Sequence, residues 1–269
     1  MADKGIISYG QHYLENTEIQ DILVGSAKLS KKDVVIEIGA GDGRITEKLS
    51  RQAGKVVAYE IDQKTKIQLK KLQEKCGNVE IRFENFLTAS LPQANKIVAS
   101  LPYQITEPFL EKIKLLKQFE RFTLLVGKNF GQMADENEDI KISKLYLLFR
   151  CYFHGEYILD VGKENFVPPP NTISSIINIW HKGKEELLQE PELYIMREIF
   201  EQRDKKVTNA LREAFIRFYS HKGDLLTKRG AKQLLQDNFD QGLTDNYLEQ
   251  MNNQQIETLF NCICKIIKN

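Results

Sequence analysis

An apolar strand that runs directly into three alternating glycines is the feature that most constrains this chain. Residues 33–38 form a run in which only Asp33 and Glu37 are not apolar, as in a strand buried on both faces. The run leads into Gly39, Gly41 and Gly43, and residues 45–52 continue with helical periodicity. Glycine lets the backbone turn tightly and lets a ligand lie against it. The segment therefore predicts a strand–turn–helix unit that binds a cofactor through its backbone; the alternative is a turn without a ligand.

The glycine spacing excludes two phosphate-binding motifs. The third glycine comes one residue too early for the G-x-G-x-x-G dinucleotide fingerprint. No Gly-Lys-Ser or Gly-Lys-Thr follows, as a Walker A loop requires. The E-x-G-x-G-x-G form, which spans Glu37 to Gly43, instead resembles the glycine motif of methyltransferases that use S-adenosylmethionine (SAM).

Strand and helix patterns alternate through the first two thirds of the chain. The patterns predict further strands at residues 55–60, 79–83, 96–99, 122–126, 156–161 and 175–180, and helices at 65–76 and 105–117. Residues 133–141 fit a loop, and 142–150 fit either a helix or a strand. This alternation predicts an α/β fold whose parallel sheet is covered on both faces.

The last third of the chain has no strand pattern. His181 to Lys184 interrupt the alternation, and the segments that follow have helical patterns at residues 196–200, 206–219, 228–239 and 255–267. We therefore predict two domains, a cofactor-binding domain at residues 1–181 and a small all-helical domain at 182–269.

Composition narrows the class of protein further. The chain is 42% hydrophobic and 28% charged, which supports a folded core and argues against disorder. We expect no membrane segment, since no run approaches about 20 apolar residues, and no secretory signal in residues 1–10. The four scattered cysteines predict free thiols in a reducing cytoplasm and no metal site.

Side chains at the ends of the second and third strands have the positions of nucleoside ligands. Glu60 lies 17 residues beyond Gly43, close to the offset of about 20 residues at which α/β folds place a ribose-binding acid. A carboxylate there can accept hydrogen bonds from both ribose hydroxyls; the alternative is a surface glutamate at a strand end. Asn85 and Phe86 follow the third strand, where a polar side chain can meet an adenine amino group and an apolar one its ring.

The fourth strand ends in Ser100-Leu101-Pro102-Tyr103, which suits methylation of a base amine. An exocyclic amine is a poor nucleophile because its lone pair is delocalised into the ring. The Ser100 side chain and the Leu101 carbonyl, held by rigid Pro102, can accept its N–H bonds, and Tyr103 can stack on an extruded base. Catalysis would then be mostly positioning of the amine. The alternative is a plain end of a strand with a packed tyrosine.

A basic segment lies in the helical region although the whole chain carries a net charge of only +1. Residues 203–232 contain nine basic and three acidic side chains, a local surplus of six positive charges. Either this is a solvated helical face or it is a surface that contacts phosphates.

Taken in order, these motifs resemble those of the ribosomal RNA adenine dimethyltransferases, the KsgA and Erm family. The segment at residues 10–14 is similar to the family's G-Q-N-F-L opening, and 37–43, Glu60 and 100–103 to its glycine, acidic and N-L-P-Y motifs. Residues 166–174 are similar to F-x-P-x-P-x-V-x-S, and 202–211 to the Q-R-x-K-x-x-x-N-A-L start of the KsgA-type helical domain.

The resemblance implies a Rossmann-like SAM-dependent catalytic domain, a helical domain that docks on ribosomal RNA, and two successive methyl transfers to N6 of adenine. S-adenosylhomocysteine is then the product, the ribosomal subunit the partner, and the protein a cytoplasmic monomer. The implied cofactor-binding residues are Gln11, His12, Leu14, Glu37, Gly39, Gly41, Gly43, Glu60, Ile61, Asn85, Phe86 and Ser100. The implied RNA-binding residues are Arg203, Lys205, Lys206, Arg212, Lys228 and Arg229. Tyr103 and Phe166 are implied to stack on the substrate base, although Phe166 suits core packing equally well.

Four departures from the family pattern leave other functions open. His12 stands for asparagine, Asn85 for aspartate and Ser100 for the catalytic asparagine or aspartate, and residues 127–133 match the family's Q-K-E-x-A-x-R poorly. A non-catalytic RNA-binding assembly factor with this fold is one alternative. An Erm-type enzyme that acts on large-subunit RNA and confers antibiotic resistance is another, which the match at 202–211 disfavours.

Overall fold

The computed structural model describes residues 12–135, 138 and 140–268. The chain divides by its internal contacts into two compact units. The described residues of Met1–Glu138 and His154–His181 form the first unit, and those of Asp139–Phe153 and Lys182–Asn269 form the second.

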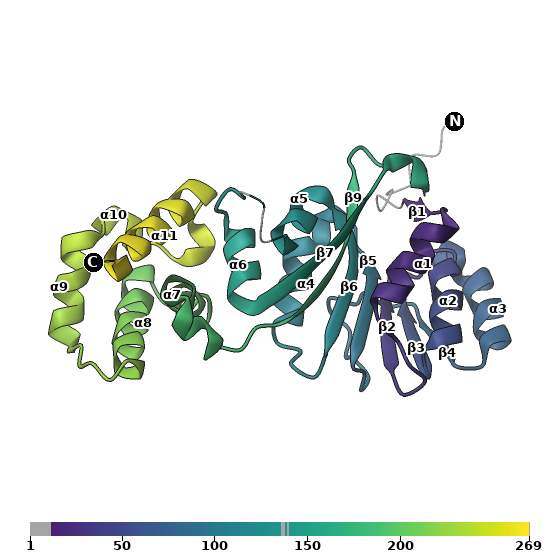
Figure 1. Ribbon diagram of the computed structural model, residues 1–269, viewed down its shortest axis with the longest axis horizontal. Helices are drawn as coiled ribbons and strands as arrows, with labels where there is room; N and C mark the ends of the chain where they lie inside the picture. Colours follow the sequence, from purple (N-terminus) through teal and green to yellow (C-terminus); the bar gives the residue numbers. More distant parts are fainter. Residues whose placement is uncertain (1–11, 136–137, 139, 269) are drawn as a thin grey trace. The chain divides into compact units, whose positions relative to one another are not determined.

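A seven-stranded sheet forms the centre of the first unit. Its strands are β2 (Val34–Ile38), β3 (Lys55–Tyr59), β4 (Val79–Arg82), β5 (Lys96–Ser100), β6 (Arg121–Gly127), β7 (Phe153–Val161) and β9 (Ser174–His181). Their order is β4-β3-β2-β5-β6-β9-β7 (Figure 1). Strands β2 to β6 pair in parallel, and β9 pairs antiparallel with β6. The predicted strands are confirmed, with their ends moved by a few residues.

The strand order reverses beside β2. From β2 the chain builds outward through β3 to β4, and it then returns to place β5 on the other side of β2. In open α/β sheets, ligands bind at such a switch point, outside the carboxyl ends of the strands. The topology therefore predicts a ligand site at the residues that follow β2 and β5.

Continuous burial along the strands shows that both faces of the sheet are covered. Val56, Val57, Ala58 and Tyr59 of β3 are each no more than 1% exposed, although successive side chains point to opposite faces. The helices of this unit are α1 (Thr17–Ser26), α2 (Arg44–Gln52), α3 (Lys66–Cys76), α4 (Thr106–Ile113) and α5 (Lys128–Gly131). The predicted α/β architecture is confirmed, but the sheet is mixed and not wholly parallel, because β9 runs antiparallel to β6. Helix α1 is one that the sequence patterns missed.

A two-stranded sheet joins segments that lie far apart in the sequence. Strand β1 (Tyr13–Leu14) pairs antiparallel with β8 (Phe166–Val167). The side chains of Leu14 and Phe166 are 5% and 4% exposed and belong to the hydrophobic core. The segment after His12 is thus held against the segment that begins at Phe166.

The second unit is helical in its described residues. Its helices are α6 (Lys144–Tyr152), α7 (Pro191–Phe200), α8 (Val207–His221), α9 (Lys228–Asn238), α10 (Gln241–Thr244) and α11 (Asn253–Lys268). The four helices predicted after residue 184 are present, although α7 begins five residues earlier than predicted. Helix α10, a single turn, was not predicted.

Residues 139–153 group with the helical unit, whereas the predicted boundary at residue 181 leaves them in the first domain. The segment left open between helix and strand is helix α6, capped by the Ser143 hydroxyl, which accepts a hydrogen bond from the Tyr146 amide. Its buried face packs on α7, where the Cys151 thiol donates to the Leu193 carbonyl and Arg197 donates to the Cys151 carbonyl. The helix lies with the second unit because its apolar face is covered there.

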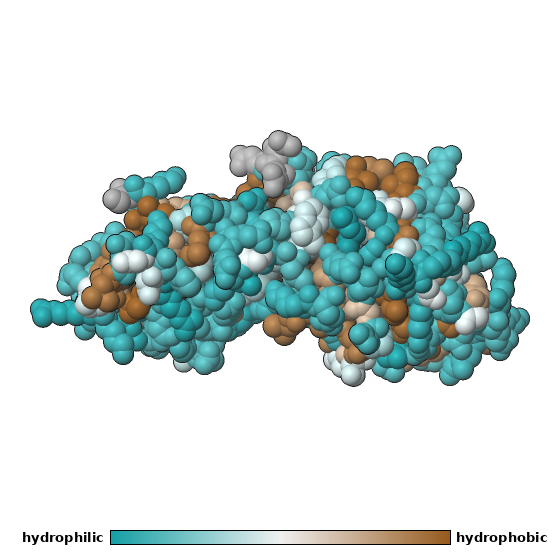
Figure 2. Space-filling model, turned by 60° about the horizontal axis from the view of Figure 1, so that its bottom comes forward, coloured by the Kyte–Doolittle hydropathy of each residue, from teal (hydrophilic) through white to brown (hydrophobic). Residues whose placement is uncertain are grey.

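No helix among the described residues is both long enough and apolar enough to cross a membrane. Hydrophobic residues are in small separate patches on the face shown in Figure 2. Large hydrophobic side chains with high exposure, among the residues described, are Ile61, Ile67, Leu115, Val167, Ile173, Leu225 and Tyr247.

Candidate active site

The glycine turn after β2 has the backbone conformation that its sequence predicts. Gly39, Gly41 and Gly43 have φ angles of +79°, +54° and +85°, in the left-handed region that favours glycine. The amides of Gly39 and Ala40 donate to the Tyr59 carbonyl at 2.9 and 3.1 Å, which ties the turn to the end of β3. The turn is therefore rigidly held at the switch point of the sheet.

Two of these glycines also lie against other parts of the predicted site. A Cβ atom added to Gly39 would lie 3.3 Å from the carbonyl oxygen of Ser100. A Cβ atom added to Gly41 would lie 3.0 Å from Cε1 of Tyr13. The structure thus brings together the glycine turn, the N-terminal opening and the end of β5, which are separate in the sequence.

Glu60 connects the end of β3 to the glycine turn. One carboxylate oxygen accepts the Gly41 amide at 2.7 Å, and the other accepts the amides of Ile61 and Asp62, both at 2.8 Å. A carboxylate offers about four lone-pair positions, so one remains. Backbone amides therefore already bind three of these positions, and the contact of Glu60 with both ribose hydroxyls stays a prediction.

Glu37 is an acid buried in the sheet below the turn. Its side chain is 1% exposed, and neither carboxylate oxygen has a well-formed hydrogen bond within the described residues. Burial raises the pKa of Glu37 to about 8, against the smaller opposing influence of the Thr46 hydroxyl. An acid in this environment holds a proton at neutral pH until a cationic group comes close enough to stabilise its ionised form.

The residues predicted around an adenine differ in their exposure. Ile61 is 44% exposed and offers an apolar surface beside Glu60. Phe86 is 4% exposed, and its ring packs against the ring of Tyr59 with centroids 5.8 Å apart, so it forms part of the core. Asn85 is exposed, and its side-chain oxygen accepts the Leu87 amide at 2.9 Å. That oxygen keeps one lone pair for a ligand.

The Ser100 tetrapeptide lies at the carboxyl end of β5. Ser100 pairs with Leu125 of β6, and the Leu101 amide donates to the Leu125 carbonyl at 2.9 Å. Among described residues, nothing is hydrogen-bonded to the Ser100 hydroxyl or the Leu101 carbonyl, so both acceptors are available. Tyr103 begins a short 3-10 helix, Tyr103–Ile105, and its side chain lies outside what the structure describes.

The N-terminal opening, residues 10–14, contains one site residue, Tyr13, that was not predicted from the sequence. Gln11 lies outside the described residues, and Leu14 is in the core. Nδ1 of His12 lies 2.7 Å from the Pro168 carbonyl oxygen, which links the opening to the segment after β8. Tyr13 covers Gly41, and burial together with the charge of Glu60 raises the pKa of its hydroxyl. Tyr13 stands between His12 and Leu14, which both belong to the opening motif, and this position could have identified it as a site residue.

Phe166 is not placed to stack on a base. Its side chain is 4% exposed and packs in the core next to Leu14, its partner across the β1–β8 pair. Of the two roles considered for Phe166, stacking on the substrate base and packing in the core, the structure shows packing in the core. Val167, its neighbour, is 49% exposed because successive strand residues point in opposite directions.

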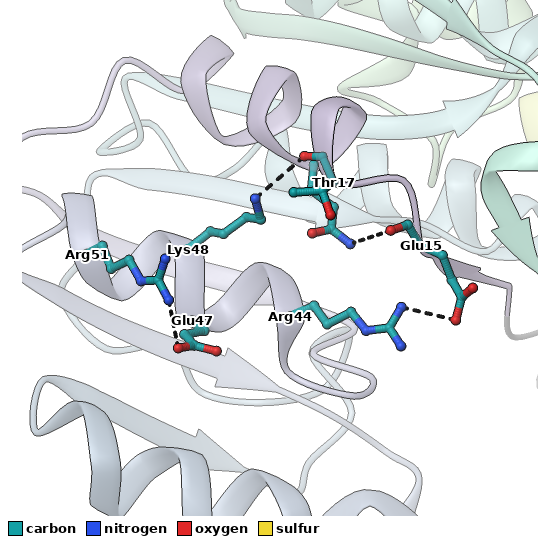
Figure 3. Close-up of a pocket in the computed structure, with 7 residues that line it drawn as sticks. Glu15, Thr17, Arg44, Glu47, Lys48 and Arg51 are labelled. Carbon is teal, nitrogen blue, oxygen red and sulfur yellow. Dashed lines mark hydrogen bonds and ion pairs between the residues drawn. The ribbon is translucent and has the colours of Figure 1, made fainter.

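A polar cavity of about 270 Å³ lies between α1 and α2, beside the end of the glycine turn (Figure 3). Arg44, Lys48 and Arg51 of α2 contribute three positive charges. Arg44 pairs with Glu15 at 3.1 Å, Arg51 pairs with Glu47 at 2.8 Å, and Lys48 pairs with Asp21. Because each cation has an acidic partner, the cavity has no surplus charge with which to attract an anion.

The predicted RNA-binding residues fall into two groups within the helical unit. Arg203 pairs with Glu249 at 2.6 Å, Lys205 with Glu213 at 2.8 Å, and Lys206 with Asp245 at 3.8 Å. The second group comprises Arg212, Lys228 and Arg229, and these residues make no ion pair with a described residue. Lys232, one turn beyond Lys228 on α9, is exposed and also has no such pair.

The geometry at the switch point fits a nucleoside cofactor. The turn carries no side chains at Gly39 and Gly41, where a Cβ atom would fill space beside Ser100 and Tyr13. Glu60 has one acceptor position left, and Ile61 offers an exposed apolar surface. These are the groups that a ribose and a flat base require.

The fold and this site define the class of protein, a SAM-dependent methyltransferase with an appended helical unit. The same fold is found in a dimethyladenosine transferase from Plasmodium falciparum, with a TM-score of 0.61 and 21% identity over 96% of this chain and 98% of that one. It is also found in the 23S rRNA methyltransferase ErmE, with a TM-score of 0.60 and 20% identity over 94% of this chain and 99% of that one.

The chain belongs to the ribosomal RNA adenine dimethylase family, whose model matches residues 2–237. It is 33% identical over 205 residues to ribosomal RNA small subunit methyltransferase A of Thermotoga maritima, an alignment covering 76% of this chain and 73% of that protein. It is 34% identical over 207 residues to the probable enzyme of the same name from Pyrococcus abyssi, covering 76% and 75%. The predicted family, SAM cofactor and class of reaction, methylation of rRNA adenine, are confirmed.

Proposed function

We propose that this protein dimethylates N6 of adenine in the RNA of the small ribosomal subunit. The observation that carries the proposal is the approach of Gly39 to the Ser100 carbonyl oxygen, which would lie 3.3 Å from a Cβ atom at Gly39. This approach supports a cofactor turn close to the end of β5, where the Ser100 hydroxyl and the Leu101 carbonyl have no hydrogen bond within the described residues. The relatives from Thermotoga maritima and Pyrococcus abyssi, named as small-subunit enzymes, support this choice of RNA.

The site residues then have distinct tasks. Bound SAM supplies an electrophilic methyl group. Ser100 and Leu101 accept the two N–H bonds of the adenine amine and orient its lone pair, while Pro102 limits the motion of both acceptors. Glu60 holds one ribose hydroxyl, Ile61 and Asn85 meet the cofactor's adenine, and Tyr103 stacks on the extruded base.

RNA binding is assigned to the helical unit. Arg212, Lys228 and Arg229 can contact phosphates without first breaking an ion pair, since they make none with a described residue. Arg203, Lys205 and Lys206 would have to exchange Glu249, Glu213 and Asp245 for phosphate. We therefore assign the larger share of the phosphate contacts to the first three residues.

The proposal includes a cytoplasmic monomer. The thiols of Cys76, Cys151, Cys262 and Cys264 are free, which suits a reducing compartment. Sedimentation of the purified chain, alone and with an RNA fragment, would test the monomeric state.

The direct test is transfer of label from radioactive SAM to isolated ribosomal subunits. We expect label in small-subunit RNA, at an adenine that yields N6,N6-dimethyladenosine on digestion. Ser100→Ala should lower kcat about tenfold, the effect of losing one hydrogen bond in the transition state, with little change in the KM for SAM. Ser90→Ala, at an exposed serine in the preceding loop, is the matched control and should behave as wild type.

Two results would replace the proposal by one of its alternatives. Label that enters only large-subunit RNA would indicate the Erm-type reaction. Binding of SAM and RNA without transfer of label, with turnover gained in Ser100→Asn, would indicate a non-catalytic assembly factor.

A further inference from the structure

A second cavity, in the helical unit, has a composition suited to a nucleotide. It measures about 270 Å³ and lies where α8, α9 and α10 meet. Its lining residues are Thr208, Arg212, Lys232, Leu235, Gln236, Phe239, Gln241, Thr244 and Asp245. Lys232, Leu235, Gln236 and Phe239 recur at helical spacing, so one face of α9 forms a wall.

The charges of this cavity are unbalanced. Arg212 and Lys232 make no ion pair with a described residue, and the one acidic residue of the lining, Asp245, is already paired with Lys206. The cavity between α1 and α2 has the same volume but a partner for every cation. Only the cavity of the helical unit therefore has positive charge left for an incoming anion.

The remaining lining separates into an apolar floor and a polar edge. Leu235 and Phe239 are 6% and 8% exposed and form the floor. The Thr208 hydroxyl donates to the Thr244 carbonyl at 2.8 Å, which joins α8 to α10 at the base of the cavity. The side chains of Gln236 and Gln241 make no hydrogen bond with a described residue, so each amide offers a donor and an acceptor.

We propose that this cavity binds one unpaired nucleotide of ribosomal RNA. Arg212 and Lys232 hold its phosphate, Leu235 and Phe239 contact the face of its base, and Gln236 and Gln241 contact the base edge. The volume lies just below the range of about 300–1,000 Å³ of sites for drug-sized ligands, which suits a single nucleotide. The inference rests on the proposed function in one respect, that RNA is the partner.

The first variant of the test fills the cavity without removing charge. Gln236→Trp adds a bulky side chain to the lining, and Gln233→Trp places the same side chain on an exposed position of α9 outside it. The full-length protein is titrated with two RNA hairpins of equal length, one with an unpaired nucleotide and one fully paired, and with free AMP. Arg212→Gln is a second variant, which removes the positive charge proposed to hold the phosphate and shortens the side chain.

Wild type should prefer the hairpin with the unpaired nucleotide. Gln236→Trp and Arg212→Gln should each weaken binding of that hairpin by about fivefold or more, the scale of one lost base contact. Gln236→Trp should leave the paired hairpin unaffected, and Gln233→Trp should bind both like wild type.

Three outcomes would overturn the inference. These are equal affinity of wild type for the two hairpins, unchanged binding by both cavity variants, and binding of AMP as tight as that of the unpaired hairpin, which would indicate a free nucleotide as ligand. Methylation of small subunits is measured on the same proteins. If wild type transfers methyl groups while the cavity variants bind RNA normally, the inference fails and the proposed function stands.

Discussion

Replacing Glu37 by glutamine should change how the stability of this protein depends on pH. Glu37 is fully buried without well-formed hydrogen bonds, and burial raises its pKa to about 8 from an ordinary value of 4.5. Between these two values the folded chain binds one more proton than the unfolded chain does. The free energy of unfolding must therefore fall as the pH rises from about 4.5 to about 8.

The size of this effect follows from the two pKa values. One proton contributes about 1.4 kcal/mol for each pH unit across the interval. Because the unfolded group is already partly ionised at pH 5, wild type should lose about 2 to 3 kcal/mol of stability from this residue between pH 5 and pH 7. Above pH 8 both states are ionised and the contribution becomes constant.

Urea denaturation of the cofactor-free protein at pH 5, 6, 7 and 8 measures the effect. Glu37→Gln keeps the shape of the side chain and removes its titration, so the difference in unfolding free energy between variant and wild type should move in favour of the variant as pH rises. Glu84→Gln, at an exposed position, should show no such trend. A difference between Glu37→Gln and wild type that stays constant from pH 5 to pH 8 would refute the reasoning.

Three further predictions concern the turn, the acid limit of stability and the cofactor. Gly43→Ala should lower the unfolding free energy by about 1 to 3 kcal/mol in urea, since φ is +85° and the new Cβ atom would lie 2.6 Å from Cδ2 of Leu72; an unchanged midpoint would contradict this. Although burial opposes it, hydrogen bonds from Asn95, Ser30 and Lys96 lower the pKa of Asp33 to about 2. Its contribution of about 2 kcal/mol to the free energy of unfolding is therefore present above pH 4 and lost as the pH falls towards 2. Asp33→Asn should flatten acid unfolding in that interval, and identical acid curves would argue against the assignment. Asn85→Asp should tighten SAM binding about fivefold by calorimetry, because a carboxylate accepts the adenine amine more strongly than an amide; equal or weaker binding would show that Asn85 does not contact it.

Much of the first unit could be predicted because short stretches of sequence specify its strands, helices and turns. A strand that is covered on both faces appears as a continuous apolar run, as at β2, β3 and β6, and turns that need left-handed backbone appear as glycines. The amphipathic helices of the second unit, such as α8 and α9, show their period in the same direct way. These signals depend on neighbours within a few residues, so no tertiary information is needed to recognise them.

Segments with weak local signals were predicted less well. Helix α1 and the start of α7 were missed, and 142–150 stayed open between helix and strand until the structure showed α6. The pattern of that segment is apolar enough for either element. Its conformation and its place in the helical unit depend on contacts with α7, about 40 residues away, such as that between Cys151 and Leu193.

The sequence by itself determined the fold class, the glycine turn, the tetrapeptide at the end of β5 and the family to which the chain belongs. Only the tertiary structure decided how these residues use their hydrogen bonds and surfaces. It showed that Glu60 gives three of its acceptor positions to backbone amides and that Phe166 packs in the core. It also showed that Arg212 and Lys232 line a cavity and make no ion pair with a described residue. The physical reason is that local patterns record which face of an element is buried, whereas the partners of each polar group are set by residues distant in the chain.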